Sequence, residues 1–172
     1  SDPLSLTTQT DTTTLNGRTS TRVYDAAQKK FTITSPTGRQ RLATIDAQGR
    51  VTQAQTTGLD PVNYTYDTRG RLTGISQGIG RNYSFSYNAQ GNLASLTDPL
   101  GRIQSYGYDA AGRVTQETLP DGRIISYSYD ANGNVTSITP PSKPAHAFNY
   151  TPVDLEDRYT PPDLGPSDEA TR

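Results

Sequence analysis

The chain has 172 residues, of which only 31% are hydrophobic, and its formal net charge is −1. A near-neutral charge gives no field that would attract nucleic acid or an anionic membrane surface, so we expect neither as a partner. The absence of Cys excludes a disulfide framework and a thiolate metal site. No apolar run approaches the roughly 18 residues of a membrane helix, so we expect no membrane insertion.

The first 15 residues are rich in Thr and lack the charged and apolar regions of a signal peptide. We predict an irregular lead-in over residues 1–15. The chain contains no Met, not even at its start, which suggests a piece of a longer protein. Any export signal is therefore expected outside this segment.

From Tyr24 onward, a position that is usually tyrosine recurs every 21 residues. Its members are Tyr24, Ile45, Tyr66, Tyr87, Tyr108, Tyr129 and Tyr150. A second aromatic position lies two residues earlier and comprises Tyr64, Phe85, Tyr106, Tyr127 and Phe148. Residues two apart on a strand share a face, and an invariant long period indicates one copied structural unit. We call the ten aromatic residues from Tyr64 to Tyr150 in these two columns the aromatic ladder.

Residues 108–128 form the clearest unit and contain two turn signals. Asp109–Gly112 places an aspartate where it can cap a turn and a glycine where φ is positive, and Pro120–Gly122 is a second turn. Between the turns, Arg113–Leu119 and Arg123–Tyr129 have the composition of strands. The turn glycines of the repeat are Gly49, Gly70, Gly91, Gly112 and Gly133.

We therefore predict an all-β fold, an antiparallel meander of repeated β-hairpins over residues 16–151 with about six repeats and a dozen strands. Two repeats are irregular, because Gln28 replaces a turn glycine and Gly58–Pro61 displaces a second turn. From Pro140 the composition becomes Pro-rich, with one further strand at His146–Tyr150. Residues 152–172 are predicted to be an extended or irregular tail or linker.

The motif Y-D-x-x-G-[RN]-[LV]-[TA] occurs as YDTRGRLT, YNAQGNLA, YDAAGRVT and YDANGNVT, together with P-D-G-R. With the 21-residue period, these residues resemble the YD repeat of the Rhs family, over residues from about 16 to 151. That family includes bacterial Rhs polymorphic toxins, shell components of insecticidal toxin complexes, wall-associated contact-inhibition proteins and animal teneurins. The resemblance implies a sheet that spirals into a hollow shell, which in toxin members encloses a cytotoxic domain.

On this resemblance, we expect a non-enzymatic structural segment of a secreted or cell-surface bacterial protein. Its partners would be the rest of the parent shell and a toxin or effector cargo. The chain has fewer repeats than a closed shell needs. Asp98–Gly101 matches the D-P-x-G letters of the self-cleaving members, but it occupies the second-turn position and is predicted to be a turn.

An alternative function is a carbohydrate-binding or cell-surface adhesion module, since aromatic rings stack on sugars. We favour a structural role, in which the ladder holds adjacent hairpins together as cross-strand aromatic pairs. The Arg residues after the turn glycines are expected to pair with neighbouring Asp residues rather than with an anionic ligand, and the Asp residues to cap turns rather than bind Ca²⁺.

His146, the only histidine, has no partner for a catalytic triad or a zinc site. We predict no catalytic residue, metal or cofactor. Because one sheet exposes two faces and two edges, the isolated segment is expected to self-associate or to cover its aromatic face with the tail.

Overall fold

The computed structural model describes residues 6–163, which form fifteen β-strands and, in that range, no helix. The strands are β1 (Thr8–Leu15), β2 (Arg18–Asp25), β3 (Lys30–Thr34), β4 (Gln40–Ile45), β5 (Val51–Thr56), β6 (Val62–Tyr66), β7 (Leu72–Gln77), β8 (Arg81–Tyr87), β9 (Leu93–Thr97), β10 (Ile103–Tyr108), β11 (Val114–Thr118), β12 (Ile124–Tyr129), β13 (Val135–Thr139), β14 (His146–Tyr150) and β15 (Glu156–Thr160). The all-β prediction is confirmed.

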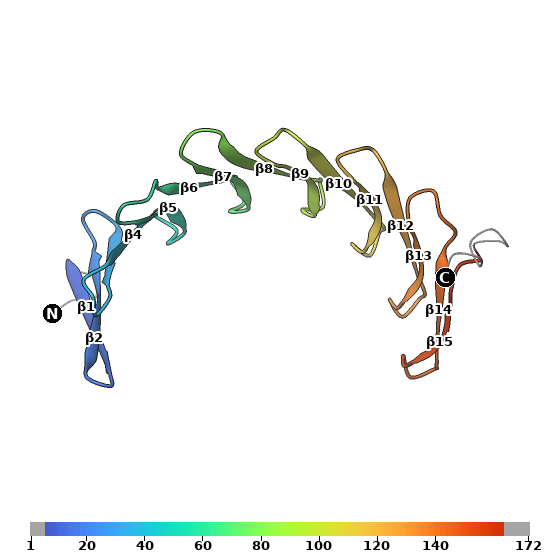
Figure 1. Ribbon diagram of the computed structural model, residues 1–172, viewed down its shortest axis with the longest axis horizontal. Helices are drawn as coiled ribbons and strands as arrows, with labels where there is room; N and C mark the ends of the chain where they lie inside the picture. Colours follow the sequence, from blue (N-terminus) through green and yellow to red (C-terminus); the bar gives the residue numbers. More distant parts are fainter. Residues whose placement is uncertain (1–5, 164–172) are drawn as a thin grey trace, which may run out of the picture. The chain divides into compact units, whose positions relative to one another are not determined.

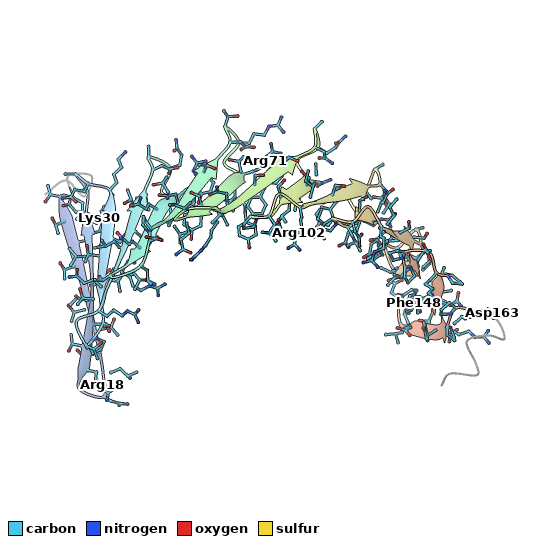
Figure 2. The ribbon with its side chains drawn as sticks, turned by 45° about the horizontal axis from the view of Figure 1, so that its top comes forward. Arg18, Lys30, Arg71, Arg102, Phe148 and Asp163 are labelled. Atoms are coloured by element: carbon cyan, nitrogen blue, oxygen red, sulfur yellow. The ribbon has the colours of Figure 1, made fainter. Side chains whose placement is uncertain are left out.

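The hydrogen-bonded order of the strands follows their order in the chain, from β1 to β15 (Figure 1). Each strand therefore pairs with the strands just before and after it, which is the predicted antiparallel meander. The chain divides into two compact units, Ser1–Ser84 and Phe85–Arg172. Within each unit the strands form one layer, and among the described residues no second sheet or helix covers either face (Figure 2).

The N-terminal segment differs from its prediction. Residues Thr8–Leu15 form β1, which pairs with β2 along its whole length from Thr8↔Asp25 to Leu15↔Arg18. The prediction of an irregular lead-in is wrong for these residues, because a run of threonines suits a strand even without the aromatic signature of the repeat. Residues 1–5 lie outside the described residues. Figure 2 shows Arg18, at the β1–β2 turn, and Lys30 at opposite ends of the strands of this first unit.

The C-terminal tail also differs from its prediction. Glu156–Thr160 form β15, which pairs with β14 instead of lying over the aromatic face. The backbone hydrogen bonds of the first turn recur here without its sequence motif. The amide of Asp154 donates to the carbonyl of Thr151 (3.0 Å), and the amide of Thr151 donates to the carbonyl of Leu155 (2.8 Å). Asp154 has φ of 60° in the place of the turn glycine. Residues 164–172 lie outside the described residues.

The first turn of each regular repeat is a type I turn followed by a residue with positive φ. In the turn at Asp109, the amide of Gly112 donates to the carbonyl of Asp109 (3.0 Å) and the amide of Asp109 donates to the carbonyl of Arg113 (3.0 Å). Oδ1 of Asp109 accepts from the amides of Ala111 and Arg113, both at 2.9 Å. The Asp side chain thus caps its own turn, and φ is 79° at Gly112.

A β-bulge follows the turns at Asp46, Asp67, Asp109 and Asp130. Opposite β6, the pairs Tyr66↔Leu72 and Thr65↔Gly74 leave Thr73 as an extra residue. The same extra residue occurs at Thr52, Thr115, Thr136 and Asp157. Because the bulge adds one residue, apolar residues three apart, such as Leu72 and Ile75, lie on the same face as the tyrosines.

The two faces of the sheet differ in chemistry. In β12, the half-buried Ile125, Tyr127 and Tyr129 alternate with the exposed Ile124, Ser126 and Ser128. We call the first side the aromatic face and the second the polar face, which carries mainly Ser, Thr, Gln and Asn. No described residue is fully buried, so the described part of the chain has no closed core. Its stability must come from contacts within the layer.

Gly101 and Gly70 both have positive φ, but only Gly70 has a neighbouring side chain close to where a Cβ would lie. A Cβ on Gly101 (φ 75°) would meet nothing within 4 Å, whereas a Cβ on Gly70 (φ 82°) would lie 3.2 Å from Nη1 of Arg50. We expect Gly101→Ala to lower the free energy of unfolding by about 1–2 kcal/mol, the cost of the left-handed conformation. Gly70→Ala should cost a further ~0.5–1 kcal/mol by displacing Arg50 from its aromatic partner. Urea denaturation measures both, and equal costs would contradict a role for the Arg50 contact.

Candidate functional site: the aromatic face

The tyrosine column links successive repeats through its hydroxyl groups. The hydroxyls of four of its tyrosines donate to the backbone carbonyl of a residue 15 positions earlier, at the end of the preceding first turn. The bonds are Tyr66 to Val51 (2.8 Å), Tyr108 to Leu93 (2.8 Å), Tyr129 to Val114 (2.7 Å) and Tyr150 to Val135 (3.0 Å). These hydroxyl groups are already engaged in the sheet.

Arginine side chains make a second link between repeats. Nε of Arg113 lies 2.7 Å from Oδ2 of Asp109 in its own turn, while the guanidinium carbon lies 4.7 Å from the ring centre of Tyr129 in the next repeat. Nη1 of Arg113 also donates to the carbonyl of Asp130 (2.9 Å). Arg50 repeats the arrangement with Asp46 (2.6 Å) and Tyr66 (4.7 Å). The ion pairs lie within each turn, and the cation–π contacts join one turn to the next.

In the second aromatic column, Tyr64 and Tyr127 do not form the predicted aromatic pairs. Tyr64 faces Ile75, and Tyr127 faces Ile138, so an aliphatic side chain separates successive rings. Each repeat supplies two strands, and successive rings are therefore about 9.5 Å apart, too far to stack. Close ring contacts in the described residues occur near the two ends of the sheet, where Tyr24 lies 4.7 Å from Phe31 and Phe148 lies 5.3 Å from Tyr159.

Glu117 is a carboxylate in a column that is otherwise aliphatic. The column at 21-residue spacing is Ala54, Ile75, Leu96, Glu117 and Ile138. Oε1 of Glu117 accepts from Nε2 of Gln104 (2.5 Å), and Oε2 accepts from the hydroxyl of Tyr127 (3.3 Å). Burial, followed by the charge of Glu117, raises the pKa of Tyr106 and of Tyr127. Both oxygens have donors on the sheet itself, which satisfies this carboxylate locally.

The turn carboxylates are held in their charged form. The amide of Arg71 is the main cause that lowers the pKa of Asp67, and the amide of Arg113 does the same for Asp109. At Asp46, burial of the carboxyl raises the pKa, but hydrogen bonds from Arg50 and the amide of Gln48 outweigh it. Carboxylates whose oxygens are occupied in this way are poor candidates for metal ligands.

A scan against protein families matches the teneurin YD-shell model over residues 5–162. The chain belongs to the teneurin YD-shell family. This match covers most of the chain, and it includes β1 and β15, which lie outside the predicted repeat region of residues 16–151. No curated protein matches the chain significantly.

Solved structures with a similar fold include a TcdB2-TccC3 complex and a Tc holotoxin pore. A crystal structure of TcdB2-TccC3-Cdc42 is similar with a TM-score of 0.58 and 19% identity over 80% of this chain. The Photorhabdus luminescens Tc holotoxin pore with a mutated TccC3 is similar with a TM-score of 0.59 and 18% identity over 86% of this chain. The YD-shell chain spans only 8–9% of those chains, so the likeness shows the fold of a small part of them.

Asp98–Gly101 is a turn of this YD shell, as predicted. The amide of Gly101 donates to the carbonyl of Asp98 (2.9 Å), and Oδ1 of Asp98 accepts from the amides of Leu100 (2.9 Å) and Arg102 (3.0 Å). Oδ2 of Asp98 lies 2.6 Å from Nη2 of Arg102. The side-chain hydrogen bond from Arg102 is the main cause that lowers the pKa of Asp98.

His146 lies on the aromatic face of β14, and its Nδ1 lies 2.6 Å from the hydroxyl of Tyr159. Within residues 6–163 there is no group of three or more His, Asp or Glu side chains that could hold a metal ion. The same residues contain no helix long and apolar enough to cross a membrane.

Proposed function

We propose that this chain is a wall segment of a secreted Rhs-type YD shell, and that it acts by enclosing a toxin or effector domain rather than by catalysing a reaction. The observation that carries this proposal is the recurring link between a tyrosine hydroxyl and a carbonyl 15 residues earlier. It joins four repeats to their predecessors without using a second layer. Membership of the YD-shell family supports the same function.

The mechanism is steric. A single hydrogen-bonded layer separates two compartments as long as its strands stay paired. Among the described residues, β1 and β15 each pair with one neighbour only, which leaves backbone groups open for further strands of the parent shell. Enclosure would keep a cargo away from proteases and target molecules until the wall opens.

Protease protection in the intact parent protein tests this function. We expect the enclosed domain to resist digestion while the wall is intact. Combined Tyr66→Ala, Tyr108→Ala and Tyr129→Ala substitutions remove three of the repeat links and should make the same domain protease-sensitive. Digestion of that domain at the same rate in the unmodified parent and in the variant would contradict the enclosure proposal.

We also propose that the isolated segment self-associates. Its aromatic face is only half-buried and its edge strands are exposed; β1 and β15 contain no residue of intermediate burial. Light scattering should give a mass above the 18.7 kDa of one chain. Thr10→Lys, which adds a charge to the edge strand β1, should lower that mass if the edges associate. A stable monomer over the accessible concentration range would contradict the proposal.

A further inference from the structure

A hollow of about 420 Å³ opens on the aromatic face of the first unit. Its apolar lining includes Ile33, Ala43, Ala54, Val62 and Tyr64, from strands β3 to β6. A volume of this size is within the range of sites that hold a small ligand or a large side chain.

The hollow exists because two columns of the repeat carry alanine at the same place. Ala43 stands where later repeats have Tyr64, Phe85, Tyr106, Tyr127 and Phe148. Ala54 stands where they have Ile75, Leu96, Glu117 and Ile138. Ala43 and Ala54 are direct cross-strand partners, so the missing ring and the missing aliphatic chain leave one continuous space.

Two opposite charges border this space. Arg41 lies two residues before Ala43 on β4, and Asp60 lies two residues before Val62. Both are exposed, and in the described part of the chain neither side chain forms an ion pair. Arg41 is on β4, and Asp60 lies in the turn before β6. Because β4 and β6 are separated by one strand, their backbones are about 9.5 Å apart. The turn arginines Arg50 and Arg113 differ, because each is already paired with the aspartate of its own turn.

We infer that this hollow binds an aromatic side chain of an extended polypeptide. In that polypeptide, an acidic residue lies two residues from the aromatic residue in one direction along the chain, and a basic residue lies two residues from it in the other direction. The ring replaces the one that the ladder lacks at Ala43, the acidic group pairs with Arg41, and the basic group pairs with Asp60. A spacing of two residues places all three side chains on one face of an extended segment. The inference rests on the proposed function for the source of the polypeptide, since a shell wall faces an enclosed chain.

The test uses the 172-residue chain and the peptide acetyl-Asp-Ala-Phe-Ala-Lys-amide. Titration followed by NMR should give saturable shifts of the Ala43 and Ala54 amides. Replacing the peptide's Phe by Ala should abolish binding, and replacing its Asp by Asn should weaken binding by about fivefold. Arg41→Gln in the protein should weaken binding to the same extent, and the two changes together should cost no more than either alone.

Ala43→Phe restores the ring of the ladder and should abolish binding while leaving the fold intact. Gln53→Phe on the polar face of the neighbouring strand β5 is the matched control and should bind as the unmodified chain does. Absence of saturable binding by the folded chain, or binding that persists in Ala43→Phe, would overturn the inference. Binding of maltoheptaose in place of the peptide, lost in Ala43→Phe, would overturn it in favour of a carbohydrate ligand. None of these outcomes bears on protease protection, which tests enclosure separately.

Discussion

Replacing Tyr129 with alanine is expected to lower the free energy of unfolding by about 2–3 kcal/mol, the largest effect of a single side chain in the wall. The substitution removes a half-buried ring, the hydrogen bond to the carbonyl of Val114 (2.7 Å) and the contact of Arg113 with the ring (4.7 Å). It also leaves the carbonyl of Val114 without that donor. Urea denaturation followed by circular dichroism measures the loss.

Two matched variants of β12 separate the contributions to this loss. Tyr129→Phe keeps the ring and its cation–π contact, and should cost only about 1 kcal/mol for the missing hydroxyl. Ser128→Ala, on the exposed polar face one residue earlier, should change stability by less than about 0.5 kcal/mol. If Tyr129→Ala were as mild as Ser128→Ala, the tyrosine column would not be the link between repeats.

Acid is expected to destabilise the sheet cooperatively. The pKa is lowered at six turn carboxylates, Asp46, Asp67, Asp98, Asp109, Asp121 and Asp130. A carboxylate whose pKa is lower in the folded state stabilises the fold above its unfolded-state pKa of about 3.9. That stabilisation is lost as the pH falls through the unfolded-state value toward the folded-state value. The urea midpoint should therefore be constant from about pH 7 to pH 5 and then fall.

The chain offers a direct control for this pH dependence. Asp46→Asn, Asp67→Asn and Asp109→Asn together remove three of the six titrating groups and their ion pairs with Arg50, Arg71 and Arg113. The triple variant should be less stable at neutral pH and should lose less stability on acidification. A triple variant with the same loss below pH 5 as the unmodified chain would show that other groups control acid unfolding.

The repeat was predictable because its turns depend on local chemistry. An aspartate followed three residues later by a glycine specifies a capped type I turn with positive φ, wherever it occurs. The same turn at Thr151 was not predicted, because Thr replaces the capping Asp and Asp154 replaces the glycine. Both substitutes can perform the same roles, but neither matches the motif.

Features that depend on pairing between strands were harder to predict, because the local sequence signals some of them and not others. The bulge at Thr73 had a signal in the sequence, since Leu72 and Ile75 are three apart where a regular strand requires an even spacing. The hollow at Ala43 and Ala54 required the register, because only their cross-strand pairing makes two small residues one space. The predicted cross-strand aromatic pairs do not form at Tyr64 and Tyr127, because each faces an isoleucine and two strands per repeat place successive rings out of reach.

The central claim is that this chain is part of a wall around a polypeptide, and a cryo-EM reconstruction of the parent protein tests it most directly. We predict a closed shell in which residues 6–163 are one stretch of a single-layer wall, with further strands paired to β1 and β15 and density for a polypeptide inside. A reconstruction in which this sheet has solvent on both sides and encloses nothing would contradict it.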